Sequence, residues 1–303
     1  MYSIYFKQIV RSTPLKTRVI TGISSIALLL LILVFFNSIF FNIVCMVTML
    51  IAFSEIIKVF LSEKDVSFFV FIGILPITIF SFLFYNRGYG NLLSWIIIIE
   101  IFYYMFLQVF FFKKLLFSQL SATLLFGTYI LFGFYSASSI NTLYPYTVYK
   151  FDGLFYLLLA LVITWGTDIF AYFIGVTFGK HKMTPELSPK KSLEGAIGGF
   201  ISGILLGELL LLAYSFTLKH ILSDYSAIIA PNSFIKLFLI SACISLISMA
   251  GDLFASTIKR QNNIKDYGNI LPGHGGIVDR FDSVIAIMPF FVMLINFTFL
   301  IVR

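Results

Sequence analysis

The run VITGISSIALLLLILVFF at residues 19–36 contains no charged side chain, and it sets the class of fold. A helix needs about 20 predominantly apolar residues to cross a bilayer. Basic residues precede the run, no small-residue cleavage site follows it, and it is longer than the core of a secretory signal. We therefore expect it to remain in the protein as a membrane-spanning helix.

The composition of the whole chain agrees with a membrane protein. Of 303 residues, 59% are hydrophobic and 12% are charged, whereas soluble domains carry about 25% charged residues. More apolar runs follow, and helix is the expected element because an open strand would leave backbone groups unpaired in lipid. The sequence predicts an all-α polytopic membrane protein with about nine transmembrane helices. The expected spans are 19–36, 38–57, 66–85, 92–112, 115–136, 151–175, 193–216, 234–257 and 282–302.

The basic residues predict the orientation. They lie in short loops between apolar runs rather than on one soluble face, so the net charge of +7 indicates no nucleic-acid partner and leaves the lipid bilayer as the partner. With the N-terminus cytosolic and the C-terminus outside, most of the 21 Lys and Arg lie inside, as the positive-inside rule requires. The polar loops 176–192 and 258–281 then face the cytosol, and we expect a multi-pass protein of the plasma (inner) membrane. The basic residues left outside are Arg87, Lys150, Lys219, Lys236 and Arg303.

Four aspartates lie at or near the cytosolic ends of these spans. Asp279 and Asp282 are three residues apart and share one face of a helix, and Asp252 lies at the inner end of the preceding span. Asp168 lies inside an earlier span, where an ionisable group is costly and is a functional candidate by default. Converging carboxylates could hold Mg²⁺, which takes oxygen ligands and shares them with substrate phosphates. A second cation is left open.

The second cytosolic loop also suits phosphate chemistry. Its glycines let the backbone approach a ligand closely and offer N–H groups to phosphate oxygens, and its basic residues supply positive charge. The alternative for each residue alone is a solvated loop, and His274 is equally well a turn residue or a phosphate donor. The glycines are Gly273, Gly275 and Gly276, and the basic residues are Lys259, Arg260, Lys265 and Arg280.

The segment from Ser256 to Asp282 resembles the signature of the phosphatidate cytidylyltransferases, also called CDP-diacylglycerol synthases. It contains Ser-x-x-Lys-Arg, Lys-Asp-x-Gly, Leu-Pro-x-His-Gly-Gly and Asp-Arg-x-Asp in the order and spacing of that family. The stretches from Trp165 to Gly175 and from Ser188 to Gly195 resemble two further motifs of the family. Departures occur at Ser192, where Thr is usual, at Leu193, where Trp is frequent, and near Thr177, where a basic residue is common. The resemblance covers roughly residues 150–303.

The resemblance implies an enzyme that joins CTP to phosphatidic acid, giving CDP-diacylglycerol and pyrophosphate for phospholipid synthesis. It divides the chain into N-terminal transmembrane helices at 1–140 and a catalytic transmembrane region with two cytosolic active-site loops at 141–303. Two alternatives are a CTP-dependent lipid-alcohol kinase and, from a different class, a polytopic membrane transporter; a homodimer is left open. The catalytic and metal-binding candidates are Asp168, Asp252, Asp279 and Asp282, the family's metal being implicated at the last three. The substrate-binding candidates are Ser188, Lys190, Lys191, Glu194, Ser256, Lys259, Arg260, Lys265, Asp266, Gly273, His274, Gly275, Gly276 and Arg280.

Three glutamates lie elsewhere in the spans. Glu100 and Glu208 are near the middle of their runs, and we expect helix–helix hydrogen bonds from them because neither adjoins the acidic cluster. Glu55 lies close to the inner edge of its span and has no assigned role. Lys190 and Lys191 are either phosphate-binding residues or only markers of topology.

Overall fold

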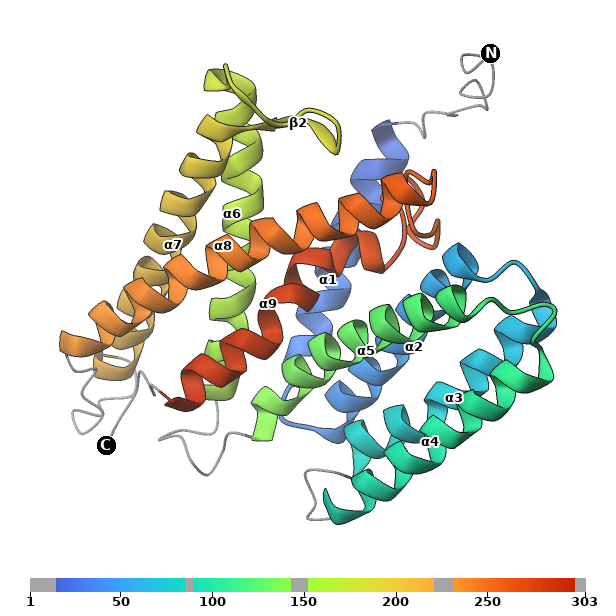
Figure 1. The fold of residues 1–303 in the computed structure, drawn as a ribbon. Coiled ribbons are helices and arrows are strands. Elements are labelled where there is room, and N and C mark those ends of the chain that lie inside the picture. The colour runs from blue at the N-terminus through green and yellow to red at the C-terminus, as the bar shows by residue number, and fades with distance from the viewer. Residues whose placement is uncertain (1–14, 85–89, 143–151, 221–230, 298–303) are drawn as a thin grey trace.

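The computed structural model describes residues 15–84, 90–142, 152–220 and 231–297 (Figure 1). In these ranges the chain is almost entirely helical, because runs of about 20 apolar residues satisfy their backbone hydrogen bonds most simply as helices in lipid. The helices are α1 Leu15–Val34, α2 Ile39–Phe60, α3 Lys64–Leu83, α4 Gly90–Phe110, α5 Phe117–Ser139, the 3₁₀ turn η3 Ile140–Thr142, α6 Asp152–Phe178, α7 Leu193–His220, α8 Pro231–Gln261 and α9 Val278–Phe297.

The structure confirms an all-α polytopic membrane protein. Six helices of the described residues are long and apolar enough to cross a bilayer, namely α2, α3, α5, α6, α7 and α8. The apolar parts of α1 and α4 are shorter, Val19–Val34 and Ser94–Phe110, and α9 begins with charged residues. The number of crossings and the orientation of the termini stay predictions.

A short hairpin interrupts the helices within the loop 176–192. Strand β1 (Lys182–Thr184) pairs antiparallel with β2 (Ser188–Ser192), and Lys182 lies opposite Ser192. Helix α7 begins directly after β2, and the Ser192 hydroxyl accepts a hydrogen bond from the N–H of Gly195 at 3.1 Å. This is the geometry of a helix N-cap. The residue that departs from the family's usual Thr therefore keeps a hydroxyl that caps the helix.

Two groups of helices meet along α5. Helices α6, α7, α8 and α9 pack on one another, α2 packs on α3 and α5, and α5 also packs on α9 (Figure 1). At Gly203 in α7, an added Cβ would collide with the hydroxyls of Thr167 in α6 and Ser245 in α8. Small residues at such crossings let helices approach closely in a membrane. The division of function at residue 140 stays a prediction.

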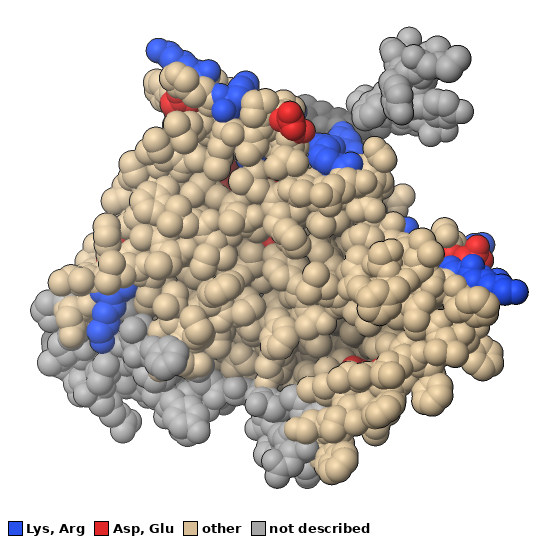
Figure 2. Space-filling view, viewed as in Figure 1, with Lys and Arg blue, Asp and Glu red and all other residues tan. Residues whose placement is uncertain are grey.

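The surface carries the signature of a lipid-facing protein. Large apolar side chains are widely exposed, including Trp95 at 65%, Phe106 at 71% and Phe110 at 87%. In Figure 2 most of the charged side chains lie along the top and at the right, with a small basic patch at the lower left, while the broad middle of this face is nearly free of them. The top is the end at which α1 begins and the hairpin lies, and the turns between α2 and α3 and between α4 and α5 lie at the right (Figure 1). Lipid must solvate the apolar middle.

Candidate active site

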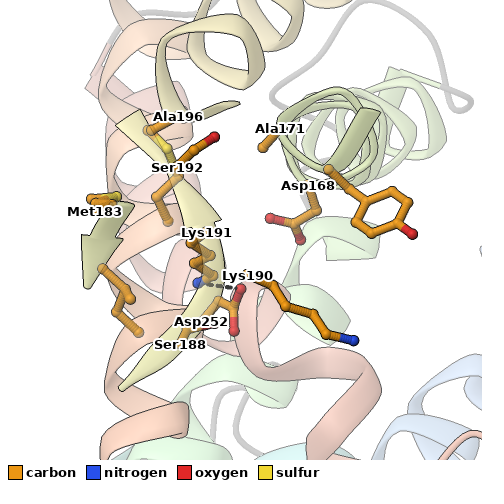
Figure 3. A pocket seen from close by; sticks show the side chains of 12 residues that line it. Asp168, Ala171, Met183, Ser188, Lys190, Lys191, Ser192, Ala196 and Asp252 are labelled. Atoms are coloured by element: carbon orange, nitrogen blue, oxygen red, sulfur yellow. Dashed lines mark ion pairs between the residues drawn. The ribbon is translucent and has the colours of Figure 1, made fainter. Parts of the chain in front are cut away.

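A cavity of about 250 Å³ opens between α6, the hairpin, the start of α7 and α8 (Figure 3). Asp168 comes to it from α6, Lys190 and Lys191 come from β2, and Asp252 comes from α8. In Figure 3 the carboxylate of Asp168 projects from α6 toward β2, and Asp252 lies beside Lys191, to which the dashed line joins it. The structure therefore brings the loop 176–192 together with the part of α8 that leads into the loop 258–281.

The acidic and basic groups of this cavity are paired in part. Lys191 Nζ lies 2.5 Å from Asp252 Oδ2, with side chains 28% and 30% exposed, so solvent reaches both charges. The Ser256 hydroxyl lies 3.4 Å from the other oxygen of Asp252. Lys190 is exposed and extends past Asp252 in Figure 3. One ammonium thus neutralises Asp252, and Lys190 is exposed at the cavity edge.

Asp282 joins this cavity to the second loop. Its charge acts on those of Asp252 and Asp279, and the charge of Asp168 acts on those of Asp252 and Asp282. Like charges this close repel one another unless cations lie between them. Lys191 and Lys259 supply positive charge to the group in this structure. Charge repulsion therefore links four aspartates from three helices. That they share one metal site stays a prediction.

Asp279 is held by the chain itself. Its Oδ1 is 2.9 Å from Lys259 Nζ, and its Oδ2 accepts hydrogen bonds from the N–H groups of Tyr267 at 2.7 Å and Gly276 at 3.0 Å. Its side chain is only 4% exposed. Lys259 Nζ also lies 5.4 Å from the centre of the Tyr267 ring. In this arrangement Asp279 fastens the second loop to the ends of α8 and α9.

Tyr267 packs against the ion pair of Asp279 and Lys259. Its hydroxyl donates to the carbonyl of Ala255 at 2.9 Å. Burial, together with the nearby charges of Asp279 and Asp282, raises the pKa of this hydroxyl above its usual range. Tyr267 therefore stays a neutral donor at physiological pH, and its ring covers the buried ion pair.

The glycines of the second loop serve its own packing. Gly273 and Gly275 have φ angles of 79° and 86°, a region that a residue with a side chain adopts only with strain. An added Cβ on Gly276 would collide with the carboxylate of Glu55. The N–H of Gly276 donates to Asp279 rather than pointing to open space. The expectation that Gly276 offers its N–H to a phosphate is therefore wrong for this arrangement, because a carboxylate of the chain accepts it.

Glu55 is the residue that sequence reasoning left without a role. It comes from α2, is 1% exposed, and accepts hydrogen bonds from the N–H groups of Ile277 and Val278, each at 3.0 Å. These N–H groups belong to the start of α9. A carboxylate near the end of an apolar run is the one sign of a role that the sequence gives. The sequence does not identify its partners, because they lie more than 220 residues away.

Two other predicted substrate-binding residues are engaged in loop contacts. Glu194 accepts hydrogen bonds from the N–H groups of Lys180 at 3.1 Å and His181 at 3.2 Å, and it pairs with the His181 ring at 2.6 Å. Arg260 donates through Nε to the carbonyl of Leu187 at 3.3 Å. Glu194 thus fixes the turn into the hairpin, and Arg260 ties the end of α8 to the hairpin's own turn.

His274 and Arg280 hold the tip of the second loop. Arg280 Nε donates to the His274 carbonyl at 2.6 Å. The His274 ring lies 2.8 Å from the hydroxyl of Thr21 in α1, and that hydroxyl also donates to the carbonyl of Pro272 at 3.2 Å. His274 therefore acts as a turn residue in this structure, which is one of the two roles that the sequence allows; the other is that of a phosphate donor.

The remaining candidates lie in two different places. Ser188 lines the cavity of Asp168 and Asp252. Lys265 and Asp266 are exposed, and Asp266 borders a separate cavity of about 400 Å³ together with Glu55. The structure thus brings Asp266 near α2 rather than near the lysines of β2.

The glutamates in mid-span have different surroundings. Glu100 in α4 accepts a hydrogen bond from the N–H of Ile77 at 3.1 Å, next to Pro76 inside α3. This confirms the expected helix–helix hydrogen bond. Glu208 has one buried oxygen with no hydrogen-bond partner in the described part of the chain, so the same expectation is wrong for that oxygen.

The acidic residues offer the type of ligand that Mg²⁺ binds, but the structure does not arrange them as a closed metal site. Among residues 15–84, 90–142, 152–220 and 231–297, no three acidic, His or Cys side chains converge closely enough to enclose an ion. Carboxylate oxygens are nevertheless the ligands that Mg²⁺ takes, and Mg²⁺ usually keeps several waters and binds through one or two carboxylates plus substrate phosphates. Asp252, on the cavity, and Asp282, whose charge acts on it, fit such an open site.

The fold and this site define a polytopic membrane protein with an acidic and lysine-lined cavity near one end of its helices. The chain belongs to the Cytidylyltransferase family, whose model matches residues 16–298. This confirms the family that the three motif segments indicate.

Relatives with a known name agree. The chain is similar to proteins named phosphatidate cytidylyltransferase from Bacillus subtilis (41% identical over 47% of this chain and 48% of the relative), Haemophilus influenzae (38%, over 48% and 47%) and Thermotoga maritima (37%, over 47% and 49%). The chain matches about half the length of each relative.

Proposed function

We propose that this protein transfers the cytidylyl group of CTP to phosphatidic acid, giving CDP-diacylglycerol and pyrophosphate at the cytosolic face of the plasma membrane. The observation that carries the proposal is the cavity in which Asp168, Asp252, Lys190 and Lys191 meet. It combines phosphate-binding charge with the ends of apolar helices. The family of the chain and the names of its relatives support the same reaction.

The walls of the cavity suit a lipid phosphate. Beside its charged residues the cavity has apolar lining from Tyr172, Met183 and Leu253, and Tyr172 is 62% exposed on α6. A phosphatidate head group lies at the bilayer surface with its acyl chains in the membrane, so it needs both kinds of surface. In the proposal Lys190 and Lys191 pair with its phosphate oxygens, Lys191 in exchange for its present partner Asp252.

The reaction needs charge neutralisation more than a strong base. A phosphate monoester has a second pKa of about 6, so phosphatidate is largely dianionic at pH 7 and is itself the nucleophile. Its oxygen forms a bond to the α-phosphorus of CTP while the bond to pyrophosphate breaks. Lys190 and Lys191 reduce the repulsion between the two anions and hold them in line, which is how phosphoryl transfer is generally accelerated.

Asp252 and Asp282 would hold Mg²⁺ in this proposal, with Asp168 as a further candidate ligand. The ion would neutralise charge on the triphosphate oxygens. Asp279, whose oxygens are taken by Lys259 and by two backbone N–H groups, would instead keep Asp282 and the loop in place.

The test is a product assay with purified protein, CTP, phosphatidic acid and Mg²⁺. The proposal expects CDP-diacylglycerol and pyrophosphate in equal amounts; release of CDP would indicate a lipid kinase, and neither product would indicate another function such as transport. Lys191→Met should lose most of the activity because it removes a cavity charge. Lys182→Met is the matched control, since Lys182 lies in the same hairpin but does not line the cavity.

A further inference from the structure

We propose that Glu55 of α2 is a positioning residue for the two carboxylates at the start of α9. The inference rests on the proposed function, because it assigns Glu55 to the reaction through Asp279 and Asp282. Glu55 does not line the cavity of Asp168 and Asp252, so it is no candidate for direct contact with substrate there.

The hydrogen bonds of Glu55 end where the acidic residues begin. Its two oxygens accept the N–H groups of Ile277 and Val278, each at 3.0 Å. Asp279 follows Val278 directly, and Asp282 comes one turn later on α9. The first N–H groups of a helix lack partners within the helix, and a carboxylate that accepts two of them fixes both the position and the direction of the first turn. Glu55 therefore sets where α9 starts.

The second loop is shaped around this carboxylate. An added Cβ on either Gly268 or Gly276 would collide with the Glu55 carboxylate, so the loop passes it closely on both sides. Glu55 is 1% exposed, and the nearby charge of Asp279 acts on it. A buried carboxylate beside another is unfavourable unless donors compensate for it, and the N–H groups of Ile277 and Val278 are those donors.

The position of α9 matters because the reaction depends on geometry. A displacement of about 1 Å in a catalytic group can lower the rate about 100-fold. Asp282 interacts with Asp252 on α8 across the helix boundary, so a shift of the first turn of α9 changes the spacing of the pair. Removing one hydrogen bond from Glu55 should alter this spacing without removing any group from the cavity.

A purely stabilising role is the alternative, and the chain offers a matched control for it. Glu100 of α4 is also a carboxylate on a helix that accepts a backbone N–H from another segment of the chain, here that of Ile77 at 3.1 Å. It lines neither of the two cavities, and its helix packs on α3. Glu55→Gln and Glu100→Gln therefore remove the same kind of charge from the same kind of bond, and only the first touches the acidic cluster.

The experiment compares both variants with the wild-type protein in nanodiscs, measuring kcat, KM for CTP, the Mg²⁺ concentration for half-maximal rate and thermal unfolding. Glu55→Gln should lower kcat at least about tenfold and raise the Mg²⁺ requirement several-fold, with a much smaller change in KM for CTP. Glu100→Gln should change unfolding alone. Kinetics of Glu55→Gln that match those of Glu100→Gln would overturn the proposal.

A second variant and a hydrogen-exchange measurement test the role of Glu55 even if Glu55→Gln does not fold or the protein catalyses another reaction. Gly268→Ala pushes the carboxylate from the other side and should reproduce the kinetic change if Glu55→Gln does not fold; unchanged kinetics in this variant would also refute the inference. Hydrogen exchange of the amides at 277–283 should be faster in Glu55→Gln than in Glu100→Gln, whatever reaction the protein catalyses. A wild-type protein that makes no CDP-diacylglycerol contradicts the proposed function, whereas equal exchange in the two variants contradicts only the role of Glu55.

Discussion

Replacing Asp279 with Asn separates two roles that a carboxylate at the start of α9 can have. In the structure Asp279 lies 2.9 Å from Lys259, and the two side chains are 4% and 13% exposed. Asn keeps one oxygen that can accept the N–H groups of Tyr267 and Gly276, but its NH₂ group then faces the ammonium. Lys259 then keeps its charge in a buried place without its ion-pair partner. The variant should therefore loosen the second loop as well as reduce turnover.

The magnitude follows from burial. Unit charges 2.9 Å apart attract by roughly 6 kcal/mol at an effective dielectric constant of about 20, and desolvation offsets much of this. Loss of one partner from a buried pair costs about 3–5 kcal/mol, because the other charge stays buried alone. Since about 1.4 kcal/mol is a factor of ten, the loop should open about 10²- to 10⁴-fold more often.

Hydrogen exchange of the amides in 262–277 measures this opening directly. The double variant Asp279→Asn with Lys259→Met should recover most of the lost protection, because no buried charge is left unpaired. Asp252→Asn is the comparison: its partner Lys191 is 28% exposed, and an exposed pair contributes only about 0–1 kcal/mol. That variant should lose turnover with little change in exchange.

Two results would refute this reasoning about Asp279. Exchange in Asp279→Asn as slow as in the wild type would mean that the ion pair with Lys259 does not hold the loop. A double variant that exchanges faster than the single variant would mean that the buried charge of Lys259 is not the source of the cost.

Four further expectations can be checked in the same preparation. Lys191 and Asp168 line one cavity, so the loss of kcat/KM in the double variant Lys191→Ala with Asp168→Asn should be smaller than the product of the two single losses. Strictly multiplicative losses would show that the two residues act independently. Chelation of Mg²⁺ with EDTA should abolish turnover but leave thermal unfolding nearly unchanged, and turnover that survives EDTA would remove the metal from the mechanism. Gly275→Ala should destabilise the second loop by about 1–2 kcal/mol in hydrogen exchange, because φ is 86° there. In a variant without native cysteines, a cysteine at Asn263 should be labelled only from the cytosol and one at Asn232 only from outside; labelling of both from one side would show that the span count is wrong.

The sequence alone determined the class of protein and the outline of its helices. The long apolar runs and the placement of Lys and Arg are local properties of the chain, and the bilayer thickness converts such runs into helices. The expected span 38–57 is α2 (Ile39–Phe60), and the expected span 193–216 lies within α7 (Leu193–His220). The sequence also predicted that Asp252 and Asp282 lie at the same ends of neighbouring spans, and the charges of these two residues act on each other in the structure.

The roles of individual residues depended on the tertiary structure. Asp279 and Asp282 look alike in the sequence, but the fold gives Asp279 an ammonium and two N–H groups, while Asp282 interacts with Asp252. The sequence predicts that Gly276 belongs to a phosphate-binding loop, yet the fold places the carboxylate of Glu55 against it. A residue's chemistry is set by the groups that surround it, and those groups come from other segments of the chain.

Glu55 shows the physical reason most directly. Its hydrogen-bond partners, Ile277 and Val278, are separated from it by six intervening helices, α3 to α8, so no local pattern of charge or hydropathy records the contact. The length of an apolar run and the charge of a loop decide whether lipid or water surrounds that segment, and both are properties of the segment's own sequence. A hydrogen bond between α2 and α9 exists only after the helices between them have packed, and that packing alone decides which carboxylates bind and which ones hold the site in place.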